Sequence, residues 1–299
     1  MPLTAQELIA DPNFMLGIRF HAGRMRNMFD AGPRLARLLA SHQRWLLTQM
    51  AFALCMERDP QDPSSGLTAT RLTTEITAFR VASRNTIRSF VDELSTYRFI
   101  ACEPGAERKR PRHYEAAQIS HQAMHGWLWS NLCALDIVDG ANRAAQFQEN
   151  PGWIRQMQPE IARNCLRDAK WREPPEQVGI FLWTDAGGLI VDHLMSRLDL
   201  QERDPDRFII GPVDSRGLAA DFMMSRTHMQ RLFAKAATYG CAGWEAQPKK
   251  PSLWISRAFV EEYCQWQAVK LAYVDKAFQR ARDLHCELEA ERPAEMADS

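Results

Sequence analysis

Side chains that can hydrogen-bond to nucleobases gather at the start of one amphipathic segment, residues 83–94. Ser83 is of the type that caps a helix N-terminus, and apolar residues follow it at three- and four-residue spacing: Ile87, Phe90, Val91 and Leu94. This spacing predicts a helix with one buried face and a polar outer face: Arg84, Asn85, Thr86 and Arg88. Guanidinium, amide and hydroxyl groups near the N-terminus of such a helix can reach base edges in the major groove of duplex DNA.

The surrounding residues, 67–120, predict the elements that would hold this helix. Ile76 and Phe79 mark the apolar face of a short preceding helix, and Val81 lies in the turn. Two strand-like runs, 99–103 and 113–119, then flank a loop with proline and glycine, which is a hairpin signal. The loop carries cations that could hold phosphates: Arg108, Lys109, Arg110 and Arg112. A helix, a turn, a capped helix and a basic hairpin form the layout of a winged helix-turn-helix.

The same pattern occurs again 142 residues later. Without a gap, Ser83-Arg84 falls on Ser225-Arg226, Thr96-Tyr97 on Thr238-Tyr239, and Glu103 on Glu245. Apolar positions keep their character while most surface residues change, and a second basic hairpin follows. This copy predicts a second set of DNA-contacting residues: Ser225, Arg226, Thr227, His228, Gln230, Arg231, Lys249 and Lys250. Because the two outer faces differ, we expect the copies to read different half-sites.

The distribution of charge supports this interpretation better than the total does. The 299 residues carry 37 basic and 37 acidic side chains, so the formal net charge is zero. Residues 80–113 nevertheless hold eight Lys/Arg against four Asp/Glu, and residues 222–255 hold five against one. Both windows therefore carry a net charge of +4, and the remainder of the chain carries −8. Such segregation is expected when only two modules meet a polyanion.

Four segments are expected along the chain, with the clearest boundary at Glu173-Pro-Pro-Glu. They are an N-terminal helical arm at 1–34, a first winged-helix domain with connecting helices at 35–172, a second winged-helix domain with a long C-terminal helix at 177–290, and an acidic tail at 291–299. The hydrophobic periodicity predicts helices at 35–56, 120–147, 153–171, 181–200 and 257–291. In the helix at 181–200, Gly187-Gly188 marks either a weak point or the start of the helix. The second helix-turn-helix unit is expected to begin near Pro212.

Each half resembles the MarR-like winged-helix transcription regulators, over residues 35–147 and 177–290. The resemblance rests on an entry helix, a loop, the helix-turn-helix, a basic wing and helices beyond the wing. It implies a mainly α fold with small β-hairpin wings and a bacterial transcription regulator that binds double-stranded DNA. Members of that family are dimers of identical subunits, whereas two unlike copies here would form an internal pseudo-dimer on an asymmetric or pseudo-palindromic site. The resemblance also allows a small-molecule effector among the linking helices, although plain core is the favoured interpretation of their Trp and Met residues.

Other functions are less well supported by the sequence. His121 and His125 could share a helix face, but no further ligand completes a metal site, and no nucleotide-binding or catalytic motif occurs. We therefore expect no enzyme activity, metal or cofactor. No secretory signal or run of about 20 apolar residues appears, which favours a cytoplasmic, nucleoid-associated protein without a membrane partner. A protein–protein adaptor or scaffold and a plasmid-type replication initiator remain alternatives, and the aromatic stripe of the last helix could support a homodimer.

Overall fold

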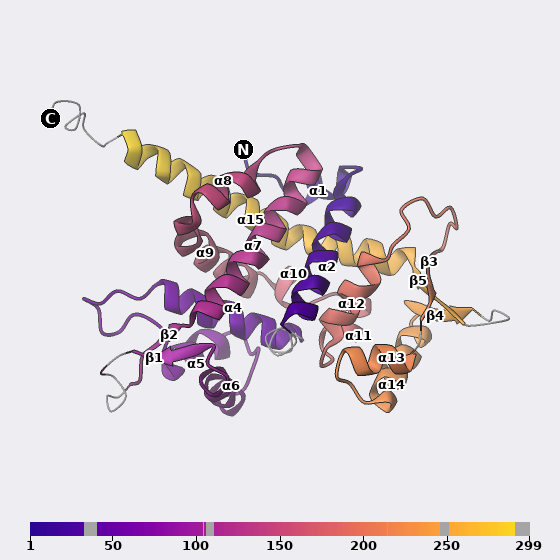
Figure 1. The fold of residues 1–299 in the computed structure, drawn as a ribbon, viewed down its shortest axis with the longest axis horizontal. Helices are drawn as coiled ribbons and strands as arrows, with labels where there is room; N and C mark the ends of the chain where they lie inside the picture. Colours follow the sequence, from indigo (N-terminus) through magenta and orange to yellow (C-terminus); the bar gives the residue numbers. More distant parts are fainter. Residues whose placement is uncertain (33–40, 104, 106–110, 214, 246–250, 291–299) are drawn as a thin grey trace.

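The computed structural model describes residues 1–32, 41–103, 105, 111–213, 215–245 and 251–290. Within these ranges the protein is mainly helical, with one two-stranded and one three-stranded antiparallel sheet. The two sheets lie at opposite ends of the molecule, and helices fill the space between them (Figure 1). The expected mainly α fold with small β-hairpins is confirmed at this level.

The first half contains a helical arm, three helices followed by a two-stranded hairpin, and a group of connecting helices. The arm consists of α1 (Ala5–Ala10) and α2 (Phe14–Ala31). The unit that follows comprises α4 (His42–Met56), α5 (Ala69–Thr77), α6 (Arg84–Thr96), β1 (Ile100–Cys102) and β2 (Tyr114–Ala116). The connecting helices are α7 (Gln118–Asp139), α8 (Arg143–Glu149), the 3-10 helix η1 (Pro151–Trp153), α9 (Ile154–Arg167) and α10 (Ala169–Arg172).

The second half repeats the order of two short helices, a hairpin and a long helix, preceded by two further helices and an additional strand. It comprises α11 (Glu176–Leu182), α12 (Gly187–Ser196), β3 (Arg207–Pro212), α13 (Ser215–Asp221), α14 (Arg226–Thr238), β4 (Ala242–Glu245), β5 (Ser252–Ser256) and α15 (Arg257–Ala290). The strand order is β3-β5-β4, with both pairs antiparallel. In the first half, a single bridge between Leu67 and Tyr114 stands where β3 pairs with β5 in the second.

The 142-residue shift found in the sequence also relates backbone features of the two halves. It superimposes the bounds of α6 on those of α14. Tyr97 and Tyr239 are the C-cap residues, and each is followed by a residue with positive φ, Arg98 at 60° and Gly240 at 69°. The following backbone N–H then donates to the carbonyl five residues earlier. The bond runs from Phe99 to Leu94 at 2.8 Å in the first half, and from Cys241 to Ala236 at 2.9 Å in the second. The repeat is therefore structural as well as sequential.

Several expected boundaries are wrong, for identifiable local reasons. The helix expected at 35–56 begins at His42, after residues that lie outside the described ranges. The helix expected at 120–147 is broken at Gly140, whose left-handed backbone (φ 72°) ends α7. The helix expected at 153–171 is split by Asp168, whose side chain caps α10. The second unit begins with β3 rather than near Pro212, because this strand pairs with β5, more than 40 residues later.

The helix expected at 181–200 is interrupted at Gly187, the position that the sequence marked as a weak point or a start, and the chain bends sharply there. The structure has α11 and α12 there, with an angle of 113° between their axes. Gly187 begins α12 so close to the Phe181 carbonyl that a Cβ atom could not be accommodated. Within the described ranges, no single helix is long and apolar enough to span a membrane. Only α11 and α12 taken together have the required length and composition.

A continuous hydrophobic core joins the two halves. Helix α2 packs on both α7 and α12, and α15 packs on α9, α10 and α1. The aromatic stripe of α15 is buried inside the chain, with Phe259 at 0%, Tyr263 at 3% and Trp266 at 5% exposure. That stripe therefore serves as core. The exposed apolar residues of α15 are Leu284 and Leu288 near its C-terminal end, so a homodimer through this helix stays a prediction that would rely on that end.

Candidate nucleic-acid interface

Both second helices of the repeated units begin with the same cap. The backbone N–H of Thr86 donates to Ser83 Oγ at 3.2 Å, and that of His228 donates to Ser225 Oγ at 3.2 Å. Both serines have extended backbone, as an N-cap requires. The predicted caps are confirmed, and the first turn of each helix consequently presents its side chains to solvent. The Thr86 hydroxyl also lies 2.9 Å from the cap hydroxyl, which occupies part of its hydrogen-bonding capacity.

Burial follows the predicted division of α6 and α14 into two faces. The inward residues are buried: Ile87, Phe90, Val91 and Leu94 in α6, and Met229, Leu232, Phe233 and Ala236 in α14. The predicted contact residues are all exposed: Ser83, Arg84, Asn85, Thr86 and Arg88 in the first unit, and Ser225, Arg226, Thr227, His228, Gln230 and Arg231 in the second. Each helix thus buries the face that anchors it and leaves the polar face open.

The exposed arginines of α6 and α14 have no ion-pair partner among the described residues, unlike many other arginines of the protein. Arg44, Arg58, Arg71, Arg163 and Arg207 all form ion pairs with glutamate or aspartate. Within the described part of the chain, no ion pair or side-chain hydrogen bond is formed by the outer-face arginines: Arg84, Arg88, Arg226 and Arg231. An unpaired guanidinium keeps its whole fork of N–H donors available for a planar acceptor such as guanine or phosphate.

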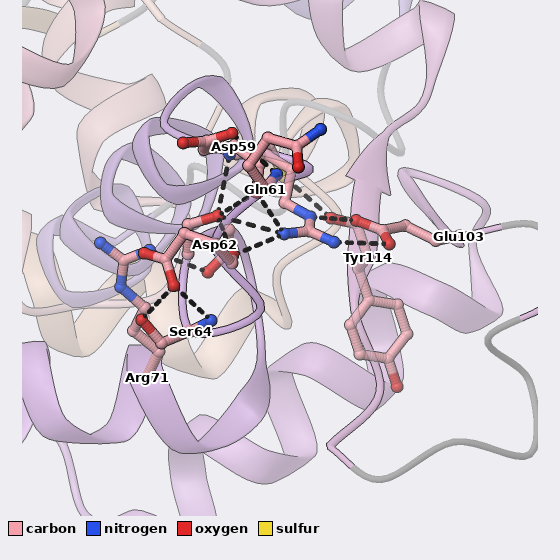
Figure 2. A network of polar contacts seen from close by, with 11 residues as sticks. Asp59, Gln61, Asp62, Ser64, Arg71, Glu103 and Tyr114 are labelled. Carbon is pink, nitrogen blue, oxygen red and sulfur yellow. Dashed lines mark hydrogen bonds and ion pairs between the residues drawn. The ribbon is translucent and has the colours of Figure 1, made fainter.

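At the base of each hairpin an arginine pairs with a glutamate, and the two glutamates, Glu103 and Glu245, occupy equivalent positions of the repeat. In the first unit, Arg58 donates to both carboxylate oxygens of Glu103, at 2.6 and 3.1 Å. Its remaining donors reach the carbonyls of Asp59 and Asp62, so the same guanidinium also holds the preceding loop; Figure 2 shows this network between the loop and the strand end. In the second unit, Arg207 donates to Glu245 at 3.1 Å. These pairs neutralise Glu103 and Glu245 at the ends of β1 and β4.

The hairpin tips are only partly described. Both predicted hairpins are confirmed by their strand pairing. In the first, Ile100 pairs with Ala116 and Cys102 with Tyr114; in the second, Ala242 pairs with Ile255. Arg112 is exposed beside β2. The remaining predicted wing cations lie outside the described residues: Arg108, Lys109, Arg110, Lys249 and Lys250.

Two further arginines belong with the candidate interface and were not singled out by the sequence. Arg80 and Arg98 precede and follow α6, and both are exposed with positive φ, 56° and 60°. A non-glycine residue in this region costs about 1–2 kcal/mol, and the repeat has Gly240 at the position of Arg98. Both side chains add positive charge to the surface on either side of α6. The sequence feature that could have indicated Arg80 and Arg98 is the excess of basic residues in the range 80–113.

The histidine pair of α7 has a packing role. The His121 ring contacts Phe52 edge to face, and the His125 ring stacks on Phe147 at 4.6 Å between centroids. Burial lowers the pKa of both imidazoles, so both are neutral at physiological pH. Searching the described residues for clusters of three or more His, Cys, Asp or Glu that could hold a metal ion finds none.

No protein-family model, curated protein or solved structure matches this chain.

Proposed function

We propose that this protein is a sequence-specific regulator of transcription that binds double-stranded DNA through two unlike winged helix-turn-helix units. The observation that carries the proposal is the paired set of capped helices, α6 and α14, whose outer faces are polar, cationic and unpaired. Both helices lie along the same lower edge of the molecule in Figure 1, with a hairpin outward of each. This arrangement supports simultaneous contact of both units with one duplex.

In the proposed complex, α6 and α14 enter successive major grooves, about one helical turn apart. Arg84 and Arg226 follow the caps directly, so each would reach a base edge, and a bidentate arginine–guanine contact discriminates by about 1–3 kcal/mol. Arg80, Arg98 and Arg112 would hold phosphates and supply affinity without sequence choice. Because Asn85 and Arg88 stand opposite Thr227 and Gln230 in the repeat, the preferred site is asymmetric or only pseudo-palindromic.

The proposal can be tested by selecting bound duplexes from a random library and measuring the affinity of the selected site by fluorescence anisotropy. Arg84→Ala and Arg226→Ala should each weaken binding roughly 5- to 150-fold and relax base preference at different positions of one site. The matched control is Arg280→Ala, an arginine 69% exposed on α15, which should leave affinity unchanged.

The salt dependence separates true DNA binding from the alternatives. Affinity for the selected site should fall steeply with salt, with each lost phosphate contact reducing the slope of log affinity against log salt by about 0.9. An adaptor that binds protein would select no duplex, and affinity insensitive to salt and to both arginine substitutions would refute the proposal. A replication initiator would select one site repeated at an origin rather than sites at promoters.

A further inference from the structure

A cavity of about 130 Å³ lies between the two halves of the chain, away from the candidate interface. Its walls come from α2, α4, α7, α10, α11, α12 and α15. Much of the wall is tryptophan: Trp171 and Trp266 stack at 3.7 Å between centroids, and Trp45 meets Trp171 edge to face at 5.3 Å. An apolar cavity of roughly 150 Å³ accommodates benzene. The space between the halves therefore suits one aromatic ring.

The cavity wall also contains a buried lysine, Lys270, which attracts the carboxylate of Asp192 without forming an ion pair with it. Lys270 is 2% exposed, and no carboxylate within the described residues lies close enough to form an ion pair with it. Its Nζ atom lies 3.4 Å from His21 Nε2, 5.8 Å from the centre of the Trp127 ring and 5.7 Å from that of the Trp171 ring. Burial lowers the pKa of Lys270 to about 8, so the ammonium form still predominates at neutral pH. At most one of its three N–H donors is used by His21.

The imidazole of His21 cannot supply the missing negative charge. Burial and the charge of Lys270 lower the pKa of His21 well below its usual value, so the ring is neutral. Its Nδ1 atom lies 2.9 Å from Ser130 Oγ. With Nε2 accepting from Lys270, Nδ1 carries the proton and donates to the serine. The lysine therefore keeps two donors for an acceptor inside the cavity.

Three other polar groups of the wall are unpartnered. Asp192 lines the cavity and has no hydrogen bond or ion pair within the described residues. Gln267 donates through Nε2 to the Tyr263 hydroxyl at 2.8 Å, and its buried Oε1 accepts from no group. The buried Nε1 of Trp171 likewise has no acceptor. Unsatisfied groups of this kind cost about 1–3 kcal/mol each when buried, and a bound molecule can satisfy them.

We propose that this cavity binds a one-ring aromatic amino acid of the aminobenzoate type, with its carboxylate at Lys270 and Trp171 and its amino group at Asp192 and Gln267. Two residues of the wall offer unused donors, Lys270 and Trp171, and two offer unused acceptors, Asp192 and Gln267. A carboxylate supplies two acceptor oxygens, and an amino group supplies two N–H donors, whereas a hydroxyl supplies only one. The tryptophan walls would stack on the ring. Binding would join the two halves through one ligand.

Isothermal titration calorimetry with the three aminobenzoate isomers tests the proposal, with benzoate and aniline as single-group controls. The best aminobenzoate should bind at least about tenfold more tightly than either control, since each control leaves one pair of wall groups unpartnered. Lys270→Met should weaken that binding at least about tenfold, and Lys276→Met, an exposed lysine of the same helix, should not change it.

A second variant keeps the test decisive if Lys270→Met does not fold. Asp192→Ala should reduce the affinity for the aminobenzoate to near that for benzoate and leave benzoate binding unchanged. Absence of measurable heat at millimolar aminobenzoate, an aminobenzoate affinity no higher than that of benzoate or aniline, or unaltered binding by both cavity variants would overturn the proposal. The experiment contains no DNA, so its outcome is independent of the proposed DNA binding.

Discussion

Replacing Arg143 by methionine should destabilise the protein strongly, because this side chain neutralises a buried acidic cluster where the halves meet. The guanidinium is 5% exposed and donates through Nε to Asp275 at 2.6 Å. Its other nitrogens contact Asp136 at 3.3 Å and Asp139 at 2.7 Å. Asp275 belongs to α15 and is completely buried, and its second oxygen accepts from the backbone N–H of Leu3 at 2.7 Å.

The structure sets the expected magnitude. Methionine retains the apolar stem but leaves three carboxylates without their cation, one of them fully buried. Removing one partner of a buried ion pair typically costs about 3–5 kcal/mol, whereas an exposed pair contributes less than about 1 kcal/mol. We therefore expect Arg143→Met to lower the free energy of unfolding by about 3–5 kcal/mol. Arg280→Met is the matched control, because Arg280 is 69% exposed and lies 3.5 Å from Glu160.

Urea denaturation followed by circular dichroism measures both variants, and an unchanged m-value shows that the shift in midpoint reports stability. The double variant Arg143→Met/Asp275→Leu should recover part of the loss, since replacing both partners removes the uncompensated charge. A loss below about 1 kcal/mol for Arg143→Met, or a double variant less stable than the sum of the two single changes, would refute the reasoning.

Three further predictions concern single residues. Ser83→Ala and Ser225→Ala should each cost about 0.5–2 kcal/mol in urea unfolding, and a large inequality between them would contradict the equivalence of the two caps. Gly240→Ala should cost about 1 kcal/mol because φ is 69°, whereas Gly152→Ala, also open to solvent but with ordinary φ, should cost nothing. Burial raises the pKa of Asp192 to about 7, so the folded protein binds a proton that the unfolded chain has lost above pH 4. Stability should therefore fall between about pH 4 and 7, by at most about 1.4 kcal/mol per pH unit; Asp192→Asn should flatten that slope, and an unchanged slope would contradict the assignment.

The features that the sequence alone determined are those set by residues a few positions apart. The serine caps, the buried faces of α6 and α14, the two hairpins and the 142-residue repeat were all predictable, because caps and amphipathic periodicity depend on neighbours within one or two turns. Gly140 is likewise a residue type that commonly ends a helix, and it ends α7. The exposure of Arg84 and Arg226 follows from the same periodicity.

The features that depend on partners distant in the chain were decided only by the tertiary structure. Strand β3 exists because β5 completes its hydrogen bonds, and α11 and α12 bend because Gly187 fits against a carbonyl. Lys270 and His21 are 249 residues apart, and nothing local marks either as buried or as facing the same cavity. Hydrogen bonding across a sheet and desolvation of a charge are set by whatever packs against the group, so periodicity cannot reveal them. The sequence thus predicts the two exposed helices, and the fold alone reveals the cavity between the halves.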